Sequence, residues 1–295
     1  MITLEELKEL IKKDYPNDYL DIIEGYKARR KTCFRINRLK TNVLEVEEYL
    51  NNNNIKYSHP SYFTDAFILD DNINLMELEL VKSGKIYLQS LSSQIPPLFL
   101  DLDNSNDILD MCAAPGGKTC EISSLTNDSK NIMACEANKI RCDRLKYNLS
   151  LQGVNRCNVQ LIDSKKLDSF FSFDTILLDA PCSGSGTVNL NNPKDLKSFS
   201  KELVLNSSKT QKELLKKAIT ILKKGHTLVY STCSILKKEN EEVIKSILNK
   251  DIVIEPISID IDTKYLLPSD INGVITVKPS DSYEGFFIAK IKKIA

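Results

Sequence analysis

Apolar runs of strand length recur through the second half of the chain, and polar or amphipathic stretches separate them. Between residues 108 and 230 these runs read ILDM, IMAC, VQLI, TILL and TLVY. A run that is apolar at nearly every position is typical of a strand buried on both faces, and such strands alternate with helices in parallel sheets. The pattern therefore predicts an α/β domain with a doubly wound, mostly parallel sheet.

An amphipathic segment precedes the last strand of this series. Its apolar residues between 214 and 222 fall on one stripe of a helix, which we expect to end at Gly225. The tail has another pattern, because GVITVKP and GFFIAKIKK lie close together in the sequence. We expect these two segments to pair as antiparallel strands.

The first 80 residues predict a smaller unit of mixed helices and strands. MITLEELKELIKK has the spacing of an amphipathic helix, and the asparagines at 51–54 mark a turn. This order predicts a small α+β domain ahead of the larger one. After the first helix we expect a strand, a helix and two short strands, at 32–37, 43–50, 55–57 and 66–69.

The composition is that of a globular chain with about two domains. The chain has 295 residues, of which 42% are hydrophobic and 27% are charged. Its start lacks the basic end and apolar core of a signal peptide, and no apolar run reaches the roughly 18 residues of a membrane span. We therefore expect a cytoplasmic protein that does not cross a membrane.

A net charge of zero gives no general attraction to nucleic acid, so the distribution of charge matters more than its sum. Residues 27–40, KARRKTCFRINRLK, hold seven Lys or Arg and no acid. Basic runs of this kind occur both on solvated faces and at nucleic-acid contacts. Taken alone, the run leaves both possibilities open.

Eight cysteines are spread over the chain without a C-x-x-C pair, and His59 and His226 are its two histidines. Zinc sites need closely spaced Cys and His ligands, so we expect no metal. Five of the cysteines lie in strand or helix patterns, where the ordinary role is that of a small buried hydrophobe. These five are Cys33, Cys120, Cys135, Cys142 and Cys157.

The glycine-rich segment CAAPGGKT, residues 112–119, joins the first strand of the larger domain to a helix. Such a turn lets a ligand approach the backbone amides at the helix N-terminus. Its last three residues also match a P-loop, but Cys112 replaces the first glycine and Pro115 lacks an amide hydrogen. A P-loop NTPase therefore remains an alternative interpretation of this segment.

Two carboxylates favour a different ligand for the same loop. Glu136 ends the second strand of the series, and Asp163 ends the third. In Rossmann-like sheets an acidic residue at the first of these positions binds ribose hydroxyls. Acids at successive strand ends would repel phosphates, so the pattern fits S-adenosylmethionine, whose adenosine carries none.

Two cysteines stand apart because they follow the fourth and fifth strands, in DAPCSGSG (179–186) and STCS (231–234). Ligands bind at the carboxyl ends of strands in doubly wound sheets, so Cys182, Cys233 and Asp179 should face one cleft. A cysteine hydrolase would need a histidine base, and neither histidine is placed to serve. Addition of a thiolate to C6 of cytosine, by contrast, makes C5 electron-rich enough to accept a methyl group. That chemistry would use both thiols, the Asp179 carboxylate and the methyl donor.

These motifs resemble the NOL1/NOP2/Sun (RsmB-like) family of S-adenosylmethionine-dependent RNA cytosine-5 methyltransferases. The resemblance covers nearly the whole chain, through FRINRLK, QSLSSQIPPL, DMCAAPGGKT, DAPCSGSG, STCS-x-x-x-x-EN and GFFIAKI. It implies an RNA-binding α+β (RRM-like) domain at 1–80 and a Rossmann-like class I methyltransferase domain at 81–295. RNA binding or assembly without catalysis remains an alternative function.

The family resemblance implies a role for each group near the thiols. Cys233 attacks C6, Cys182 assists release of the methylated base, and Asp179 holds the cytosine edge with Lys118 close by. DNA cytosine methyltransferases attack from a Pro-Cys pair like Pro181-Cys182, so the reversed assignment of the thiols stays open. The expected cofactor-binding residues are Cys112, Ala113, Ala114, Pro115, Gly116, Gly117, Lys118, Glu136, Asp163 and Asp179.

The resemblance also assigns part of the basic run to RNA. Arg35, Asn37 and Lys40 match the family's basic N-terminal motif, so we expect them to contact RNA. The substrate would be ribosomal or transfer RNA, since the family modifies each, and we expect the enzyme to act as a monomer. Glu136 departs from the aspartate more usual in the family, which keeps the carboxylate and lengthens its arm.

Overall fold

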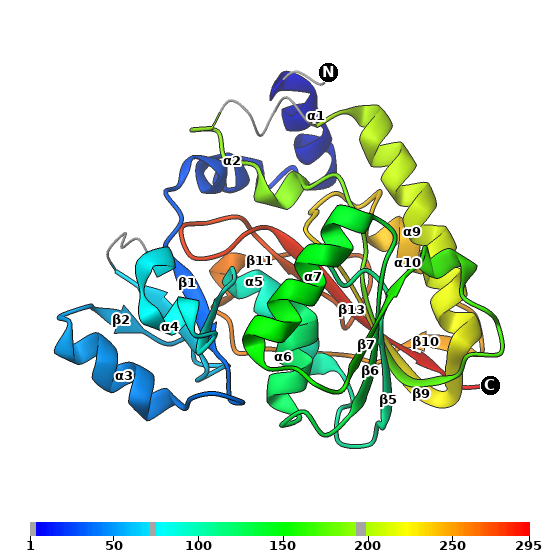
Figure 1. Cartoon of the computed structure of the whole chain (residues 1–295). Helices are drawn as coiled ribbons and strands as arrows, with labels where there is room; N and C mark the ends of the chain where they lie inside the picture. The colour runs from blue at the N-terminus through cyan, green and yellow to red at the C-terminus, as the bar shows by residue number, and fades with distance from the viewer. Residues whose placement is uncertain (1–3, 71–74, 193–198) are drawn as a thin grey trace.

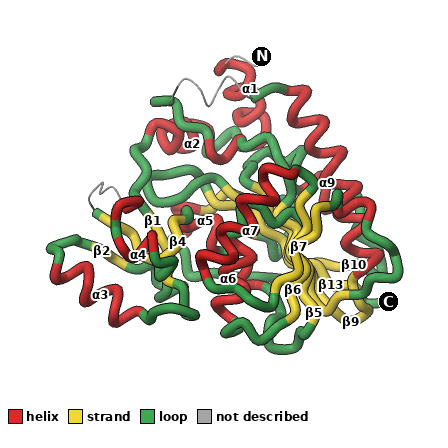
Figure 2. The backbone as a smooth tube through the Cα atoms, in the orientation of Figure 1, coloured by secondary structure: helices red, strands yellow, loops and turns green. Residues whose placement is uncertain are grey.

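The computed structural model describes residues 4–70, 75–192 and 199–295, and it contains two β-sheets. Figure 1 shows the smaller sheet, in blue and cyan, beside α6 (Gly117–Leu125) and α7 (Lys139–Gln152), which cover the larger sheet. In Figure 2 the strands of the larger sheet form one yellow layer with helices on either side. This arrangement confirms the α/β fold class with a smaller N-terminal α+β unit.

The smaller sheet has four antiparallel strands in the order β2-β3-β1-β4. Together with its two helices it has the chain order β-α-β-β-α-β, which is the ferredoxin-like arrangement. Phe34 and Phe67 stack at its centre with ring centroids 4.8 Å apart. Its elements are β1 (Cys33–Ile36), α3 (Val43–Asn52), β2 (Tyr57–Ser58), β3 (Ala66–Leu69), α4 (Glu79–Lys82) and β4 (Ile86–Leu88).

Two features change the predicted division of the chain at residue 80. That boundary falls inside α4, and β4 lies beyond it although it pairs with β1 in the small sheet. In addition, α1 (Leu4–Asp14) and α2 (Tyr19–Lys27) pack their apolar faces on the larger domain, in one cluster with Val188 and Ile235. We therefore take the small domain to run from β1 through β4, because strand pairing and burial, rather than chain order, decide where each element belongs.

The larger sheet contains nine strands in the part of the chain that the structure describes. Five of them, from the edge strand β7 inward, are parallel in the order β7-β6-β5-β8-β9. The strand order reverses between β5 and β8, and ligands bind at such a switch point, outside the carboxyl ends of the strands. All five strands lie where the apolar runs predicted them. They are β5 (Asp107–Asp110), β6 (Asn131–Glu136), β7 (Cys157–Leu161), β8 (Phe173–Asp179) and β9 (Leu222–Thr232).

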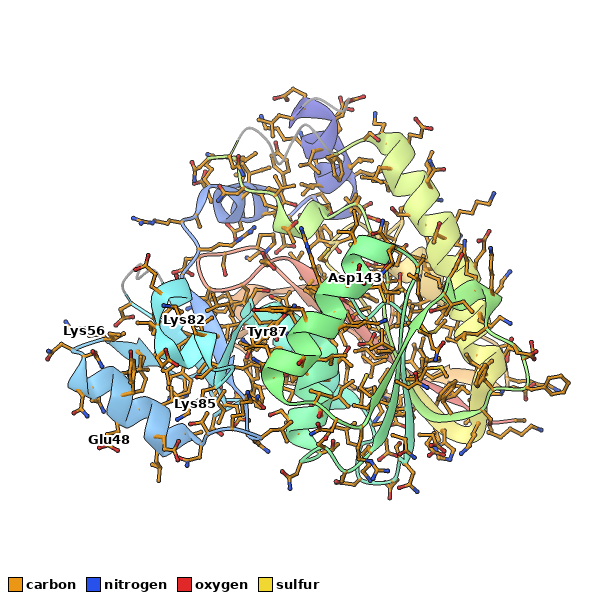
Figure 3. All side chains as sticks on the ribbon, viewed as in Figure 1. Glu48, Lys56, Lys82, Lys85, Tyr87 and Asp143 are labelled. Carbon is orange, nitrogen blue, oxygen red and sulfur yellow. The ribbon has the colours of Figure 1, made fainter. Side chains whose placement is uncertain are left out.

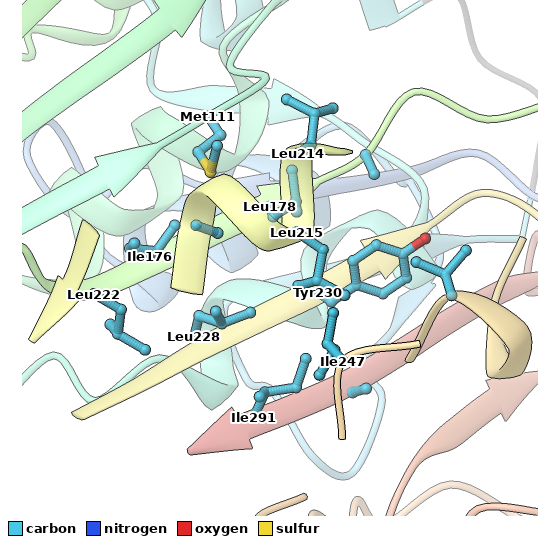
Figure 4. Close-up of a cluster of buried hydrophobic side chains, with 14 of the residues drawn as sticks. Met111, Ile176, Leu178, Leu214, Leu215, Leu222, Leu228, Tyr230, Ile247 and Ile291 are labelled. Atoms are coloured by element: carbon cyan, nitrogen blue, oxygen red, sulfur yellow. The ribbon is translucent and has the colours of Figure 1, made fainter. Parts of the chain in front are cut away.

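Alternate residues of these strands pack against different helices. Ile176, Leu178 and Leu228 face α9 (Lys201–Ile221) and α10 (Glu241–Lys245), as Figure 4 shows for the buried cluster around Leu214 and Leu215. Neighbouring residues on the same strands point to the opposite face, against α5 (Leu91–Gln94) and α6. The sheet is thus buried on both faces, which explains its apolar runs.

Antiparallel strands complete the larger sheet beside β9. The tail segments pair as predicted, with Ile275 of β12 opposite Ile288 of β13, and β13 pairs with β9. Helix α9 ends at Ile221, four residues before the predicted Gly225, because β9 begins at once at Leu222. The remaining elements are β10 (Ile252–Ile254), β11 (Leu266–Leu267), β12 (Ile275–Val277), β13 (Phe286–Lys293) and short 3₁₀ turns at 75–77, 96–99, 164–166, 185–187 and 263–265.

Candidate active site

The two thiols predicted to share a cleft lie in contact. Their loops leave neighbouring parallel strands, and Asp179 at the end of β8 pairs in register with Ser231 near the end of β9. The Sγ atoms of Cys182 and Cys233 are 2.8 Å apart and form a hydrogen bond between two free, partly buried thiols. The sheet therefore brings together two cysteines that are 51 residues apart in the chain.

The contact between the thiols changes the acidity of Cys182. Its hydrogen bond with Cys233, in which either sulfur can donate, raises the pKa of Cys182, and burial raises it further. Cys182 therefore keeps its proton at neutral pH. Because the thiolate is the nucleophilic form of cysteine, this environment disfavours Cys182 as the attacking sulfur.

A lysine and a carboxylate lie beside the thiols. Lys118 Nζ is 2.7 Å from Asp179 Oδ2 and donates to Ser93 Oγ at 2.8 Å. The other oxygen of Asp179 accepts from Ser231 Oγ at 2.8 Å. Burial by itself lowers the pKa of Lys118, but the Asp179 carboxylate outweighs it, and the pKa is raised. The ammonium therefore stays charged and holds the Asp179 carboxylate in place.

A buried glutamate holds the two cysteine loops together. Glu239 accepts from the Ser183 amide at 2.7 Å on one loop and from Ser234 Oγ at 2.6 Å on the other. The next residue, Asn240, accepts from Thr232 Oγ1 at 2.6 Å and donates to the Ser234 carbonyl at 2.9 Å. Both side chains are fully buried, so they fix the loop geometry without facing the cleft.

Glycines allow the loops to approach other backbone segments. A Cβ on Gly186 would lie 1.9 Å from the Gly285 carbonyl oxygen, and the Gly186 amide donates to the Cys233 carbonyl at 3.0 Å. Gly116 has φ +109° ahead of helix α6, a conformation that favours glycine. These positions need glycine because of close contact in the first case and backbone conformation in the second.

One cavity, the sheet cavity, lies at the ends of the parallel strands and has a volume of about 360 Å³. Glu136 and Asp163 line it, as predicted for the cofactor pocket, together with apolar Ile162 and Leu214. Glu136 is 5% exposed; one of its oxygens accepts from the Asn138 amide at 2.9 Å, and the other lies 3.4 Å from the Arg141 guanidinium. The sheet cavity therefore offers two carboxylates, each paired with a cation, and an apolar wall.

A second cavity, the junction cavity, lies where the small domain meets the larger one and has a volume of about 410 Å³. Lys118 lines it beneath the ring of Phe286, with Nζ 5.4 Å from the ring centroid. Ser93 and Glu284 add polar groups from segments that are far apart in the chain. One cation, Lys118, and the carboxylates of Asp179 and Glu284 therefore line the same space.

The two cavities share four residues, Cys112, Ala114, Asp179 and Cys233. Cys182 lines the sheet cavity and is absent from the junction cavity. The predicted cofactor residues divide between the two. Cys112, Ala114, Glu136, Asp163 and Asp179 line the sheet cavity, whereas Ala113, Pro115, Gly117 and Lys118 line the junction cavity and Gly116 lines neither.

The prediction that Arg35 and Asn37 contact RNA is wrong, because both side chains are 1% exposed. Arg35 donates to the Gly117 carbonyl at 2.7 Å and lies 3.6 Å from the Glu121 carboxylate. Asn37 donates to the carbonyls of Gly84 and Gln152. Their polar atoms join the small domain to the glycine-rich segment 112–119 and to helix α7, so neither side chain faces a phosphate.

Lys40 differs from these two because it is exposed, although its ammonium donates to the Ser83 and Leu151 carbonyls. Its predicted contact with RNA stays a prediction. Arg30 of the same basic run is half-buried and donates to the Thr187 and Val188 carbonyls beside the cysteine loop. Much of the basic run therefore holds the two domains together.

Several side chains at the site were not assigned from the sequence. Ser93, Glu284, Phe286 and Glu239 all lie in segments that carried the family resemblance, QSLSSQ, GFFIAKI with its preceding residue, and STCS-x-x-x-x-EN. The sequence signal that could have pointed to these side chains is their position within or next to the family's motifs. It could not say which of them face a cavity, because that depends on contacts between distant segments.

Among the described residues no cluster of three or more His, Cys, Asp or Glu side chains is arranged to hold a metal ion. Over the same ranges, each helix is too short or too polar to cross a membrane. The predicted buried cysteines are largely where expected, since Cys33, Cys120, Cys135 and Cys142 are buried and Cys157 is partly buried.

Family models match both parts of the chain. The model described as 16S rRNA methyltransferase RsmB/F matches residues 97–292, and a ferredoxin-like domain model of RsmF/B-like methyltransferases matches residues 7–76. A crystal structure of a methyltransferase homolog protein from Pyrococcus horikoshii superposes with a TM-score of 0.82 at 31% identity, covering 97% of this chain and 94% of the other.

Named relatives include enzymes for two kinds of RNA. The chain is 34% identical to ribosomal RNA small subunit methyltransferase F of Shewanella woodyi over 97% of its own length, and it spans 62% of that protein. It is also 34% identical to tRNA (cytosine(49)-C(5))-methyltransferase of Pyrococcus abyssi, over 91% of this chain and 89% of that protein. With the family model covering most of the larger domain, the chain belongs to the RsmB/F family of methyltransferases.

Proposed function

We propose that this chain transfers a methyl group from S-adenosylmethionine to C5 of a cytosine in RNA, with Cys233 as the nucleophile. The observation that carries the proposal is that Cys233 lines both cavities, whereas Cys182 lines the sheet cavity alone. A thiol at the opening between two cavities can contact a base in one while that base faces a methyl donor in the other. This placement supports Cys233 over the reversed assignment.

The sheet cavity fits S-adenosylmethionine by the chemistry of its lining. Glu136 and Asp163 can accept hydrogen bonds from ribose hydroxyls and amino groups, and Ile162 and Leu214 offer apolar contact to an adenine ring. When bound, this cofactor supplies an electrophilic methyl group on a sulfonium centre.

The junction cavity suits a cytosine that has been turned out of its stack. Asp179 lines this cavity, and a carboxylate accepts a hydrogen bond from the N4 amino group of cytosine. Uracil has a carbonyl oxygen at that position, which the carboxylate would repel. Lys118 holds the Asp179 carboxylate in position at 2.7 Å, so the pair would select cytosine over uracil.

Each step of the reaction has a group in place. The Cys233 thiolate forms a bond to C6, which moves electron density to C5, where the methyl group is added. A base then takes the C5 proton, and the electrons of the C5–H bond restore the C5–C6 double bond. The C6–S bond breaks at the same time, and its electrons return to Cys233 as the thiolate. Addition of Cys233 ends its hydrogen bond with Cys182, which removes the main cause of the raised pKa of that thiol. Cys182 can then lose its proton to solvent and take the C5 proton.

Ribosomal and transfer RNA are both candidate substrates, because relatives named for each match this chain. The chain spans 62% of the ribosomal RNA relative from Shewanella woodyi and 89% of the transfer RNA relative. We propose that it modifies one of the two as a monomer in the cytoplasm. A mass measurement of the purified chain in solution tests the oligomeric state.

The central test measures transfer of a labelled methyl group from S-adenosylmethionine to RNA from cells that lack the gene. Bisulfite sequencing of the same RNA before and after the reaction then locates the modified cytosine. We expect label in RNA and a new 5-methylcytosine. RNA binding without transfer would support the noncatalytic alternative, and ATP binding without S-adenosylmethionine binding would support the P-loop alternative.

A further inference from the structure

A groove on the outside of the domain junction takes no part in the chemistry described above. It has a volume of about 410 Å³ and lies between α4 and β4 of the small domain and helix α7 of the larger one. Lys82 and Tyr87 line it from the small domain, and Tyr147, Asn148 and Leu151 line it from α7. We call it the tyrosine groove. Figure 3 shows Tyr87 and Lys82 on the side of the small domain that faces α7.

The tyrosine groove adjoins the junction cavity. Tyr87 and Leu88 line both spaces, so the ring of Tyr87 forms a partition between them. Arg35 lies over this ring with its guanidinium carbon 5.1 Å from the centroid. Asn148 donates to Tyr87 Oη at 3.5 Å and to the Pro115 carbonyl at 2.7 Å. These contacts hold Tyr87 in position against the cofactor loop.

The groove has the chemistry of a stacking site for a nucleotide. Tyr147 is 67% exposed although it stands on a regular helix, so its ring is presented to solvent on a rigid support. Lys82 is exposed at the end of α4, and no acidic side chain occurs among the described lining residues. Proteins bind single-stranded RNA by combining aromatic rings for base stacking with cations near the backbone.

We propose that the tyrosine groove binds the base of a nucleotide next to the target cytosine, stacked on Tyr147, with Lys82 near the adjoining phosphate. The inference rests on the proposed function, since a cytosine in the junction cavity is what brings its neighbour across the Tyr87 partition. Two features favour RNA over a peptide as the occupant. Lys82 supplies a positive charge, and the tyrosine groove adjoins the junction cavity, where the target cytosine is proposed to bind.

Ultraviolet crosslinking of the full chain to ribosomal RNA, followed by trypsin digestion and mass spectrometry, tests this placement. We expect a nucleotide added to the peptide 147–156, which begins at Tyr147 and ends at Arg156. Crosslinks at other peptides alone would overturn the inference. The same preparation is assayed for methyl transfer. Methyl transfer without a crosslink at this peptide would overturn the inference alone, whereas absence of methyl transfer would count against the proposed function.

Variants at the groove give a second measurement. Stacking of one base contributes about 1–3 kcal/mol, so Tyr147→Ala should weaken RNA binding by about 5-fold or more, while Tyr147→Phe should keep it. Phe170→Ala is the matched control, because Phe170 is 96% exposed and lies outside the groove. Equal RNA affinity of Tyr147→Ala and the wild type in filter binding would contradict the stacking role.

Discussion

The two cavities that meet at Cys233 are built in different ways. The sheet cavity takes its lining from strand ends and following loops of the larger domain alone, between Met111 and Leu214, with Cys233 added. The junction cavity combines residues of the small domain's last strand and the following turn, the glycine loop, both cysteine loops and the strand that follows Glu284. The first is a local product of the α/β fold. The second exists only when distant segments have come together.

This difference predicts that substitutions will separate two functions, cofactor binding and the handling of the target base. A residue in the sheet cavity should change affinity for S-adenosylmethionine, and a residue in the junction cavity should change the rate of methyl transfer. We call the residues that line both cavities, Cys112, Ala114, Asp179 and Cys233, the shared wall, and substitutions there should change the reaction itself. The four predictions below run from the largest expected effect to the smallest.

The largest effect is expected at the shared thiol. Cys233→Ala should abolish methyl transfer and leave no covalent adduct, because no sulfur remains to add to C6. Cys182→Ala should still add and methylate but stall before release, since the thiol that takes the C5 proton is missing. Denaturing gel electrophoresis detects the stalled species as a protein–RNA band.

The opposite pattern would reverse the assignment of the thiols. If Cys233→Ala accumulates the adduct, Cys182 is the nucleophile, and the shared wall does not identify the reacting sulfur. If neither variant yields an adduct and both keep activity, the covalent mechanism is wrong.

The next effect concerns the contact that joins the domains. Removing one partner of a buried ion pair destabilises a protein by about 3–5 kcal/mol. We expect a loss of this size for Arg35→Ala above pH 8, where the Glu121 carboxylate, 3.6 Å from Arg35 in the wild type, is ionised. Chemical denaturation measures the change in the free energy of unfolding. The double variant Arg35→Ala/Glu121→Gln should lose less than Arg35→Ala, because no buried charge remains.

The loss of folding stability caused by Arg35→Ala should grow with pH. This dependence distinguishes loss of the charge from loss of side-chain packing, which would not depend on pH. Burial raises the pKa of Glu121 from 4.5 to about 8, so its protonated form favours folding and this contribution falls as pH rises from about 4.5 toward 8. Without Arg35 the folded-state pKa rises further. Arg35→Ala should therefore be more destabilising at pH 8 than at pH 5, and an equal loss at both would contradict a charge effect.

A third effect should appear in the junction cavity alone. Lys118→Met removes the cation that holds Asp179, and loss of one such preorganised charge lowers kcat by about 10²–10³-fold. The affinity for S-adenosylmethionine should stay unchanged, because Lys118 does not line the sheet cavity. Lys118→Arg keeps the charge and should retain more activity. Single-turnover kinetics and calorimetry measure the two quantities separately, and parallel losses in both would contradict the division.

The smallest effect is expected in the sheet cavity. Glu136→Ala should weaken S-adenosylmethionine binding by about 1–3 kcal/mol, the penalty for leaving polar partners unpaired, as measured by calorimetry. RNA affinity should not change. Glu136→Asp keeps the carboxylate and should bind the cofactor more tightly than the alanine variant. Equal cofactor affinity of all three proteins would remove Glu136 from the site.

Much of the larger domain could be predicted because its signals are local. Five apolar runs identified the five parallel strands, and the glycine loop and two cysteine motifs lie at their carboxyl ends. Strand ends of a parallel sheet meet at one edge, so the contact between Cys182 and Cys233 followed from their positions in the sequence. The same reasoning brought Glu136 and Asp163 to one cavity.

The basic run shows where this reasoning fails. Charge along a sequence does not say whether a side chain faces solvent, and Arg35 and Asn37 are buried because the small domain packs its first strand toward the glycine loop. The boundary at residue 80 failed for a related reason. Strand β4 follows a short helix and carries no sequence signal for pairing with β1, some 50 residues earlier.

The sequence by itself determined the parallel sheet and the placement of the glycine loop and the two cysteine loops at neighbouring strand ends, because periodicity and motif spacing act within a few residues or at adjacent strand ends. Only the tertiary structure decided which sulfur lies on the wall between two cavities, and which cations are used to join the domains. It also placed Glu239 across both cysteine loops and Tyr87 between the junction cavity and the tyrosine groove. The physical reason is that burial and hydrogen-bond partners depend on contacts between segments far apart in the chain, and no local pattern records them.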